Sequence, residues 1–131
     1  MKKLIYLFLT VLIVSCSGDS SDDSNTSIVG NWQLTAMLES GIPIHDSCDL
    51  ESNMTLSITN TGKYNQYYSD DPATEPCGLD GVLDMTWSKD SPSTYSLSFT
   101  GVSGSSFSAI LDGETLTIDG DDNEVLVFSR N

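Results

Sequence analysis

The sequence predicts an all-β fold, a small eight-stranded antiparallel up-and-down barrel that carries one disulfide. From residue 28 onward apolar and polar side chains alternate with a period of two, as in strands with one buried and one wet face. Turn-forming clusters interrupt the alternation at intervals of roughly 8–12 residues, which favours a closed or nearly closed antiparallel sheet over β–α–β units. No segment shows helical periodicity over about ten residues, so we expect a single domain over residues 28–131.

Eight strands are expected, at residues 29–39, 53–60, 63–69, 81–88, 93–100, 105–112, 114–119 and 123–129. In the second strand Met54, Leu56 and Ile58 alternate with hydroxyl-bearing residues, which places these three on the buried face. The fourth to seventh strands repeat the pattern, with apolar faces made by Leu83, Met85 and Trp87, by Tyr95, Leu97 and Phe99, by Phe107, Ala109 and Leu111, and by Leu116 and Ile118. The last strand is apolar on both faces over residues 125–128.

The connections are rich in Gly, Pro, Asn, Asp and Ser, at residues 60–62, 89–92, 101–104, 112–113 and 119–123. Asp112-Gly113 is the strongest hairpin signal, because both residues tolerate a positive φ. Two longer connections are expected, at residues 41–51 and 70–81.

The N-terminus predicts export and lipid modification. Lys2 and Lys3 precede an apolar run over residues 4–14, which is too short for a hydrocarbon core that needs roughly 20 residues, so residues 1–15 are predicted to be a cleaved signal peptide. The run over residues 12–16 resembles the bacterial lipobox, which implies that Cys16 is acylated, for example with palmitate, and begins the mature protein. An ordinary secretory signal that happens to contain a cysteine is the alternative.

Residues 16–27 are expected to form a lipidated flexible tether, since no apolar residue follows Cys16 in this segment. Asp19, Asp22 and Asp23 resemble the acidic export signals of some Gram-negative lipoproteins, which implies an outer-membrane location and surface exposure. A plain polar spacer is the alternative.

The charge of the chain excludes nucleic-acid binding. The formal net charge is -14, and loss of residues 1–15 removes two lysines and no acidic residue, so the mature chain carries -16. The cations that remain are Lys63, Lys89 and Arg130, whereas nucleic-acid binders need clustered lysine and arginine. The same charge argues against docking flat on anionic lipid.

Two cysteines remain once Cys16 is acylated. Cys48 and Cys77, in an oxidising compartment outside the cytoplasm, are expected to form a disulfide that joins the two long connections. Closing a loop of about 30 residues contributes roughly 3–4 kcal/mol in the chain-entropy account. A zinc site is the alternative, but the spacing it requires is absent from the sequence.

The segment over residues 28–35, with Gly30 and Trp32, resembles the start of the lipocalin-like domains of Gram-negative lipoproteins, which are calycin-type barrels. The hairpin at residues 61–64, the cysteine positions and the final pair of apolar runs fit the same family, so that the resemblance covers about 28–130. It implies that Arg130 packs over Trp32 and closes the base of the barrel. A guanidinium on an indole face contributes about 0.5–2 kcal/mol.

A barrel of eight strands is just wide enough to fill with its own side chains or to hold one small ligand, and the short strands favour a filled interior. Tyr64, Tyr67, Tyr68 and Trp87 are the candidate ligand-binding residues, expected near the mouth of the barrel, where aromatic rings stack on a sugar or an apolar ligand. Ordinary strand packing is the alternative for these four.

Two groups of carboxylates are weak calcium candidates, Asp70, Asp71, Glu75 and Asp80 in one loop and Asp119, Asp121, Asp122 and Glu124 at a hairpin end. Neither has the ordered spacing of a dedicated calcium loop, so solvated turns are the simpler interpretation and no metal is assigned. The contiguous residues 45–47 cannot converge as a catalytic triad, and His45 is the one histidine of the chain. We therefore expect no enzyme activity and no cofactor.

Two functions remain open. The first is a membrane-anchored, non-enzymatic, monomeric lipoprotein whose barrel mouth binds a small apolar or glycan ligand. The second is a structural or interaction subunit with a filled barrel that docks to another protein of the cell envelope.

Overall fold

A computed structural model describes residues 27–103 and 106–131 of the chain. The predicted signal peptide, Cys16, the aspartates of the tether and residue 105 of the sixth expected strand lie outside the described residues. The described elements are β1 (Gly30–Glu39), β2 (Ile42–Pro43), the 3-10 helix η3 (Asp49–Glu51), β3 (Asn53–Leu56), β4 (Thr61–Tyr68), β5 (Gly78–Lys89), β6 (Thr94–Phe99), β7 (Ser106–Asp112), β8 (Thr115–Asp119) and β9 (Glu124–Arg130).

The sheet closes into the expected barrel. From β3 to β9 each strand pairs antiparallel with the next, β1 pairs with β3, and β9 returns to β1 from Trp32 opposite Arg130 to Glu39 opposite Glu124. The prediction of an eight-stranded antiparallel up-and-down barrel is therefore confirmed. The two-residue β2 is an addition outside this cylinder, paired only with the end of β1.

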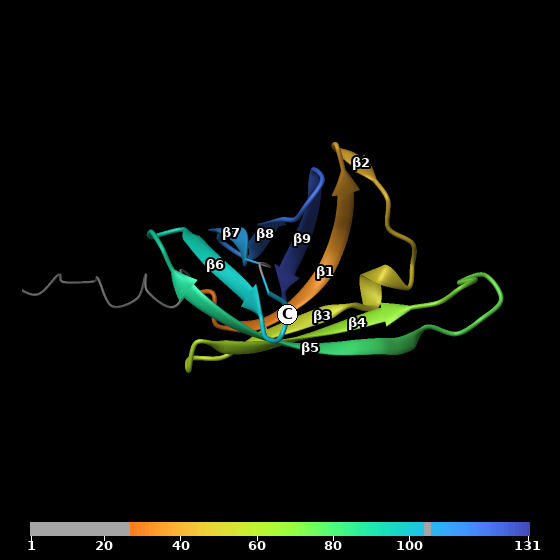
Figure 1. The fold of residues 1–131 in the computed structure, drawn as a ribbon. Helices are drawn as coiled ribbons and strands as arrows, with labels where there is room; N and C mark the ends of the chain where they lie inside the picture. Colours follow the sequence, from red (N-terminus) through yellow and green to blue (C-terminus); the bar gives the residue numbers. More distant parts are fainter. Residues whose placement is uncertain (1–26, 104–105) are drawn as a thin grey trace, which may run out of the picture.

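The barrel has two different ends (Figure 1). One end, the base, holds the start of β1, the end of β9 and the β3–β4, β5–β6 and β7–β8 turns. The other end, the mouth, holds the β1–β3, β4–β5, β6–β7 and β8–β9 connections. At the mouth the β1–β2 hairpin and the long β4–β5 hairpin diverge, so the cylinder flares open on that side.

Several expected boundaries are wrong, and the third strand begins at Thr61 and not at residue 63. The second strand ends at Leu56, not at residue 60, because residues 57–60 form a turn that the Ser57 amide closes by donating to the Thr61 carbonyl oxygen at 2.8 Å. Ile58 consequently points to solvent and is 83% exposed, not on the buried face. The fourth strand begins at Gly78 and not at residue 81, and residues 42–43, expected in a connection, pair with β1.

The core fills the base of the barrel. Its largest fully buried side chains include Trp32, Tyr95, Phe128, Ile28, Leu34, Met54, Leu56, Leu97 and Leu116. Burial of this kind contributes about 1.5–3 kcal/mol for each large apolar side chain. The base is therefore a packed plug of side chains and not a passage.

The Cys48–Cys77 disulfide is present and links residues whose Cα atoms are 5.4 Å apart. It joins the segment before η3 to the residue that precedes β5, so the two longest connections at the mouth are tied to each other. The predicted disulfide is confirmed.

Substitution Gly62→Ala is expected to destabilise the barrel by about 1–3 kcal/mol, because the interior at β4 has no room for a methyl group. A Cβ atom at Gly62 would lie 2.6 Å from Leu56 Cδ2, 2.7 Å from the Thr55 carbonyl oxygen and 3.0 Å from Met85 Cγ. The matched control is Gly81→Ala, where a Cβ atom would meet nothing within 4 Å. Urea unfolding curves measure both, and equal midpoints for the two variants would contradict this packing.

Candidate functional site

The base of the barrel is closed by Arg130 and Trp32. The guanidinium carbon of Arg130 lies 4.4 Å from the centre of the Trp32 ring. Its terminal nitrogens donate to the carbonyl oxygens of Val29 at 2.8 Å and Ser27 at 2.6 Å, and its Nε lies 3.3 Å from a Glu114 carboxylate oxygen. The structure thus brings together the two residues that the resemblance pairs.

Gly30 is required by this arrangement. Its φ of +147° lies in a region that side-chain-bearing residues rarely adopt, and a Cβ atom there would lie 2.6 Å from Arg130 Nη1. Trp32 is held on its other edge, where its indole nitrogen donates to the Ile28 carbonyl oxygen at 2.9 Å. In the Gly-x-Trp pattern, therefore, the glycine leaves room for the Arg130 guanidinium and the tryptophan supplies the ring on which it packs.

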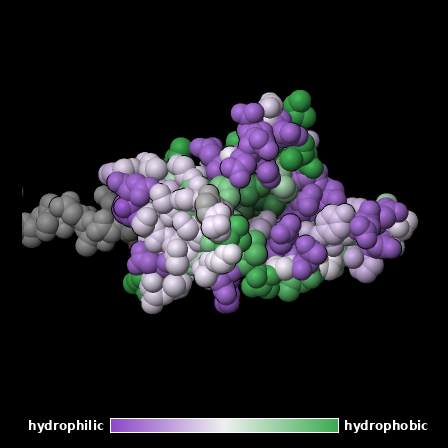
Figure 2. Space-filling view, viewed as in Figure 1, coloured by the Kyte–Doolittle hydropathy of each residue, from purple (hydrophilic) through white to green (hydrophobic). Residues whose placement is uncertain are grey.

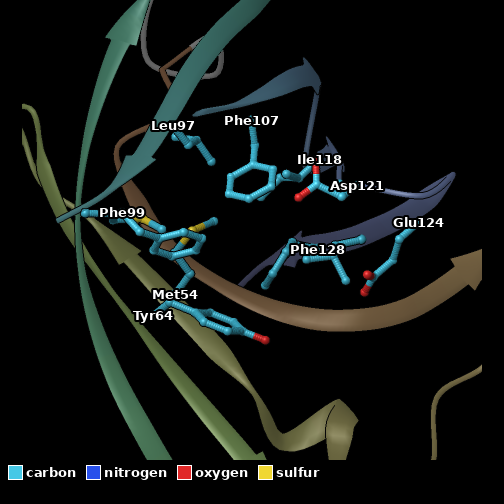
Figure 3. A pocket seen from close by; sticks show the side chains of 12 residues that line it. Met54, Tyr64, Leu97, Phe99, Phe107, Ile118, Asp121, Glu124 and Phe128 are labelled. Carbon is cyan, nitrogen blue, oxygen red and sulfur yellow. The ribbon is translucent and has the colours of Figure 1, made fainter. Parts of the chain in front are cut away.

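A cavity of about 200 Å³ lies above this plug and opens toward the mouth (Figure 3). Nine of its twelve lining residues are apolar or aromatic, and they come from β3 to β9: Met54, Tyr64, Met85, Leu97, Phe99, Phe107, Ile118, Leu126 and Phe128. Gly120, Asp121 and Glu124 complete the lining at the β8–β9 turn. The space-filling view shows a hollow with hydrophobic side chains at its floor and hydrophilic ones around it (Figure 2).

The β8–β9 turn fixes the two carboxylates at the cavity rim. Asp122 and Asn123 adopt left-handed φ values of 54° and 65°, and the Glu124 amide donates to the Asp121 carbonyl oxygen at 3.0 Å. The Asn123 carbonyl oxygen accepts from the Ser40 amide at 3.1 Å, which ties the turn to the β1–β2 hairpin. The backbone at Asp121 and Glu124 is therefore fixed within the turn, and the turn is fixed against the β1–β2 hairpin.

Tyr64 forms one wall of the cavity. Its ring lies 6.2 Å from Phe128 and 6.4 Å from Phe99, centre to centre. Burial raises the pKa of the Tyr64 hydroxyl above its ordinary value, the Ser52 side chain opposes the shift, and the nearby charges of Asp49 and Glu124 add to it. Tyr64 is thus a neutral hydroxyl group at the edge of an apolar space.

The other three aromatic candidates do not line the cavity. Trp87 lies at the base, where its indole nitrogen donates to the Ser57 carbonyl oxygen at 3.0 Å and its ring packs edge-on against Tyr95. Its expected place at the mouth is therefore wrong, because β5 runs from mouth to base and Trp87 comes near its end. Tyr67 and Tyr68 lie at the mouth end of β4 beyond the cavity.

Tyr68 is an exposed residue whose hydroxyl donates to a carboxylate oxygen of Asp70 at 3.2 Å. That hydrogen bond, together with the Asp70 charge, raises the pKa of the Tyr68 hydroxyl. The hydroxyl of Tyr68 and the carboxylate of Asp70 are therefore hydrogen-bonded to each other on the surface of the β4–β5 hairpin.

The remaining polar candidates form local structure. Asp71 accepts from the Ala73 amide and from the Thr74 hydroxyl within its own loop, and His45 Nδ1 accepts from the Met37 amide at 3.1 Å. Within residues 27–103 and 106–131, no three His, Cys, Asp or Glu side chains gather closely enough to hold a metal ion. Over the same residues no helix has the length and apolar character to cross a membrane.

A second hollow of about 460 Å³ lies on the outer face of β3, β4 and β5. It is larger than the cavity, but its lining is mostly polar, with Thr55, Thr61, Asn65 and Thr86 around an exposed ion pair of Lys63 with Asp84 at 2.6 Å. Met85 is the one large apolar side chain in its lining and no aromatic ring contributes, whereas nine apolar or aromatic side chains enclose the interior cavity. The interior cavity is therefore the better candidate.

Sequence reasoning identified most cavity residues as inward-facing, but not as the wall of a site. Met54, Met85, Leu97, Phe107 and Ile118 stand on the predicted inner faces, and what distinguishes them from the rest of the core is that they line the empty space. Asp121 and Glu124 appeared only as calcium candidates. An assignment of each turn to the mouth or to the base would have identified both the apolar wall of the cavity and the two carboxylates at its rim.

Comparison with known proteins gives one family. Residues 28–126 match the family model described as a lipocalin-like domain. No protein of curated function and no solved structure matches the chain.

Substitution Arg130→Ala is expected to lower the free energy of unfolding by about 2–4 kcal/mol, because it removes the ring contact, two hydrogen bonds and an ion pair from a side chain that is only 19% exposed. Lys89→Ala is the matched control, since Lys89 also lies over a ring, that of Tyr95, at 5.7 Å but near the surface. We expect the control to change stability by about 0.5 kcal/mol or less. Thermal unfolding of both variants measures the difference, and similar losses would contradict a special role for the arginine.

Proposed function

The chain belongs to the lipocalin-like domain family, and from that premise we propose that it is a monomeric, lipid-anchored binding protein of the cell envelope whose barrel takes one small apolar ligand through its mouth. Lipocalin-like domains are generally non-enzymatic, and the proposal includes no chemical step. The observation that carries it is the apolar cavity above the plugged base.

The volume of the cavity limits the size of the ligand. Pockets for drug-sized ligands measure roughly 300–1,000 Å³, whereas an apolar cavity of roughly 150 Å³ already binds benzene. The volume here is about 200 Å³, which matches a single ring or a short alkyl chain. A long acyl chain would need to extend out of the mouth.

The lining favours an apolar ligand over a glycan. Tyr64 supplies a hydroxyl, and Asp121 and Glu124 supply carboxylates at the rim, but the walls beneath them are Met, Leu, Ile and Phe side chains. A sugar buried among these walls would lose hydrogen bonds to water without replacing them, at a cost of roughly 1–3 kcal/mol for each hydroxyl.

The anchor is proposed from the sequence. Acylated Cys16 would hold the protein in the outer membrane, and residues 17–27 would separate the barrel from it. Support for the orientation comes from Ile28, which is fully buried in the base, so the tether joins the barrel at the end opposite the mouth. The mouth would then face away from the point of attachment.

A second candidate function is docking to another envelope protein. Several large apolar side chains near the mouth are exposed, with fractions of 66% for Ile42, 46% for Ile44, 53% for Leu79 and 54% for Val102. Neighbouring exposed apolar side chains are typical of contact surfaces, although Ile58 at the base is exposed as well. A stoichiometric partner, in the absence of any ligand response, would favour this function.

Methyl-group NMR of the three methionines that follow Cys16 tests the cavity. Saturating 1-octanol is expected to shift the Met54 and Met85 methyl signals, because both side chains line the cavity, and to leave Met37, which does not line it, unchanged. Leu126→Trp should fill the cavity and abolish the shifts, whereas Ile110→Trp, on the outer face, should preserve them. Unchanged Met54 and Met85 signals in the native protein would overturn the proposal.

Substitution Cys16→Ser tests the anchor in Gram-negative cells that express the full chain. The native protein is expected to incorporate labelled palmitate and to sediment with membranes, and the variant is expected to do neither, because the thiol to which the lipid is attached is gone. Cys48→Ser, which breaks the disulfide but spares Cys16, is the control and should keep the label. Label on the Cys16→Ser protein would refute anchoring at this residue.

A further inference from the structure

Charge is distributed unevenly between the two ends of the barrel. Lys89 and Arg130 lie at the base, and Lys63, near the start of β4, is paired with Asp84. Within the described part of the chain no lysine or arginine lies at the mouth. The mouth connections and the strand ends beside them carry Glu39, Asp46, Asp49, Glu51, Asp70, Asp71, Glu75, Asp80, Asp119, Asp121, Asp122 and Glu124.

Two of these carboxylates belong to the cavity itself. Asp121 and Glu124 line it together with the apolar walls, and in Figure 3 Asp121 lies beside Ile118 and Glu124 lies near Phe128. Neither carboxylate forms a hydrogen bond or an ion pair with any of residues 27–103 and 106–131. Glu124 is also half-buried, so its charge faces a space from which water is partly excluded.

The strand register adds a second carboxylate beside Glu124. Glu39 stands directly opposite Glu124 in the β1–β9 ladder, and residues in that position share a face of the sheet. Like charges directly opposite each other destabilise a sheet, and a bound cation would remove that repulsion. The charge of Glu124 also reaches the cavity wall, where it contributes to the raised pKa of Tyr64.

We propose that the ligand is an amphiphilic amine, whose apolar part enters the cavity between Met54 and Phe128 and whose ammonium group pairs with Asp121 and Glu124 at the rim. The inference rests on the proposed function, because the cavity is the site and the carboxylates decide only the charge of what enters it. A carboxylate-bearing ligand such as a fatty acid is disfavoured at the same rim by like-charge repulsion.

Three eight-carbon probes that differ only in their head group test this proposal on the full-length protein: octylammonium, 1-octanol and octanoate. Calorimetric titration at pH 7 is expected to give the tightest binding for octylammonium, about tenfold tighter than 1-octanol, and the weakest for octanoate. Added salt should weaken the binding of octylammonium and leave that of 1-octanol unchanged, since only the former contains an ion pair.

Charge-neutral variants connect the preference to the two carboxylates. Glu124→Gln and Asp121→Asn should each weaken octylammonium binding by about three- to tenfold while leaving 1-octanol binding unchanged. Asp112→Asn removes one charge from the base end of β7 and is the matched control, with no expected effect on any probe.

The outcomes separate this inference from the proposed function. Equal affinities for the three probes, or tightest binding of octanoate, would overturn the amine assignment and leave the apolar cavity standing. The absence of binding by all three would overturn both. An octylammonium preference that Asp112→Asn reduces as much as Glu124→Gln does would also overturn the inference, because it would reflect the net charge of the protein and not the rim.

Discussion

The contact of Arg130 with Trp32 is the constraint on which the rest of the barrel depends. It joins the last residue of β9 to the start of β1 and to the residues just before it. The guanidinium lies 4.4 Å from the Trp32 ring and donates hydrogen bonds to the carbonyl oxygens of Val29 and Ser27. Trp32 and Arg130 also form the terminal pair of the β1–β9 ladder, and this ladder turns an open sheet into a cylinder. Gly30 is fixed by this geometry, because only a residue without a Cβ leaves room for the guanidinium.

Because the base is closed, the interior of the barrel is accessible from the mouth and not from the base. Side chains fill the barrel from Ile28 up to Met54 and Phe128, and the space that remains opens only where the strands flare apart. The disulfide and the bond between Ser40 and Asn123 hold the flared connections, so the mouth keeps its shape although few core residues reach it. Most of the acidic residues that the structure describes lie around this opening.

The sequence predicted what local periodicity controls and missed what depends on long-range placement. Period-two alternation located the eight barrel strands, and the cysteine pair and the Gly-x-Trp segment located the closure of the loops and the base. Ile58 was assigned to the core because its strand pattern continues into a turn whose hydrogen bond is not visible in the pattern. Trp87 was assigned to the mouth because aromatic residues were grouped by type, whereas the direction of β5 places it at the base.

The state of the Arg130 guanidinium in solution tests this account most directly, and NMR of its Nε and Nη protons measures it. If the guanidinium packs on Trp32, its Nε and Nη protons are expected to exchange slowly with water, to show ring-current shifts and to show cross-relaxation with the indole of Trp32. Fast-exchanging, averaged protons without contact to that indole would contradict the account, because the base of the barrel would then be open.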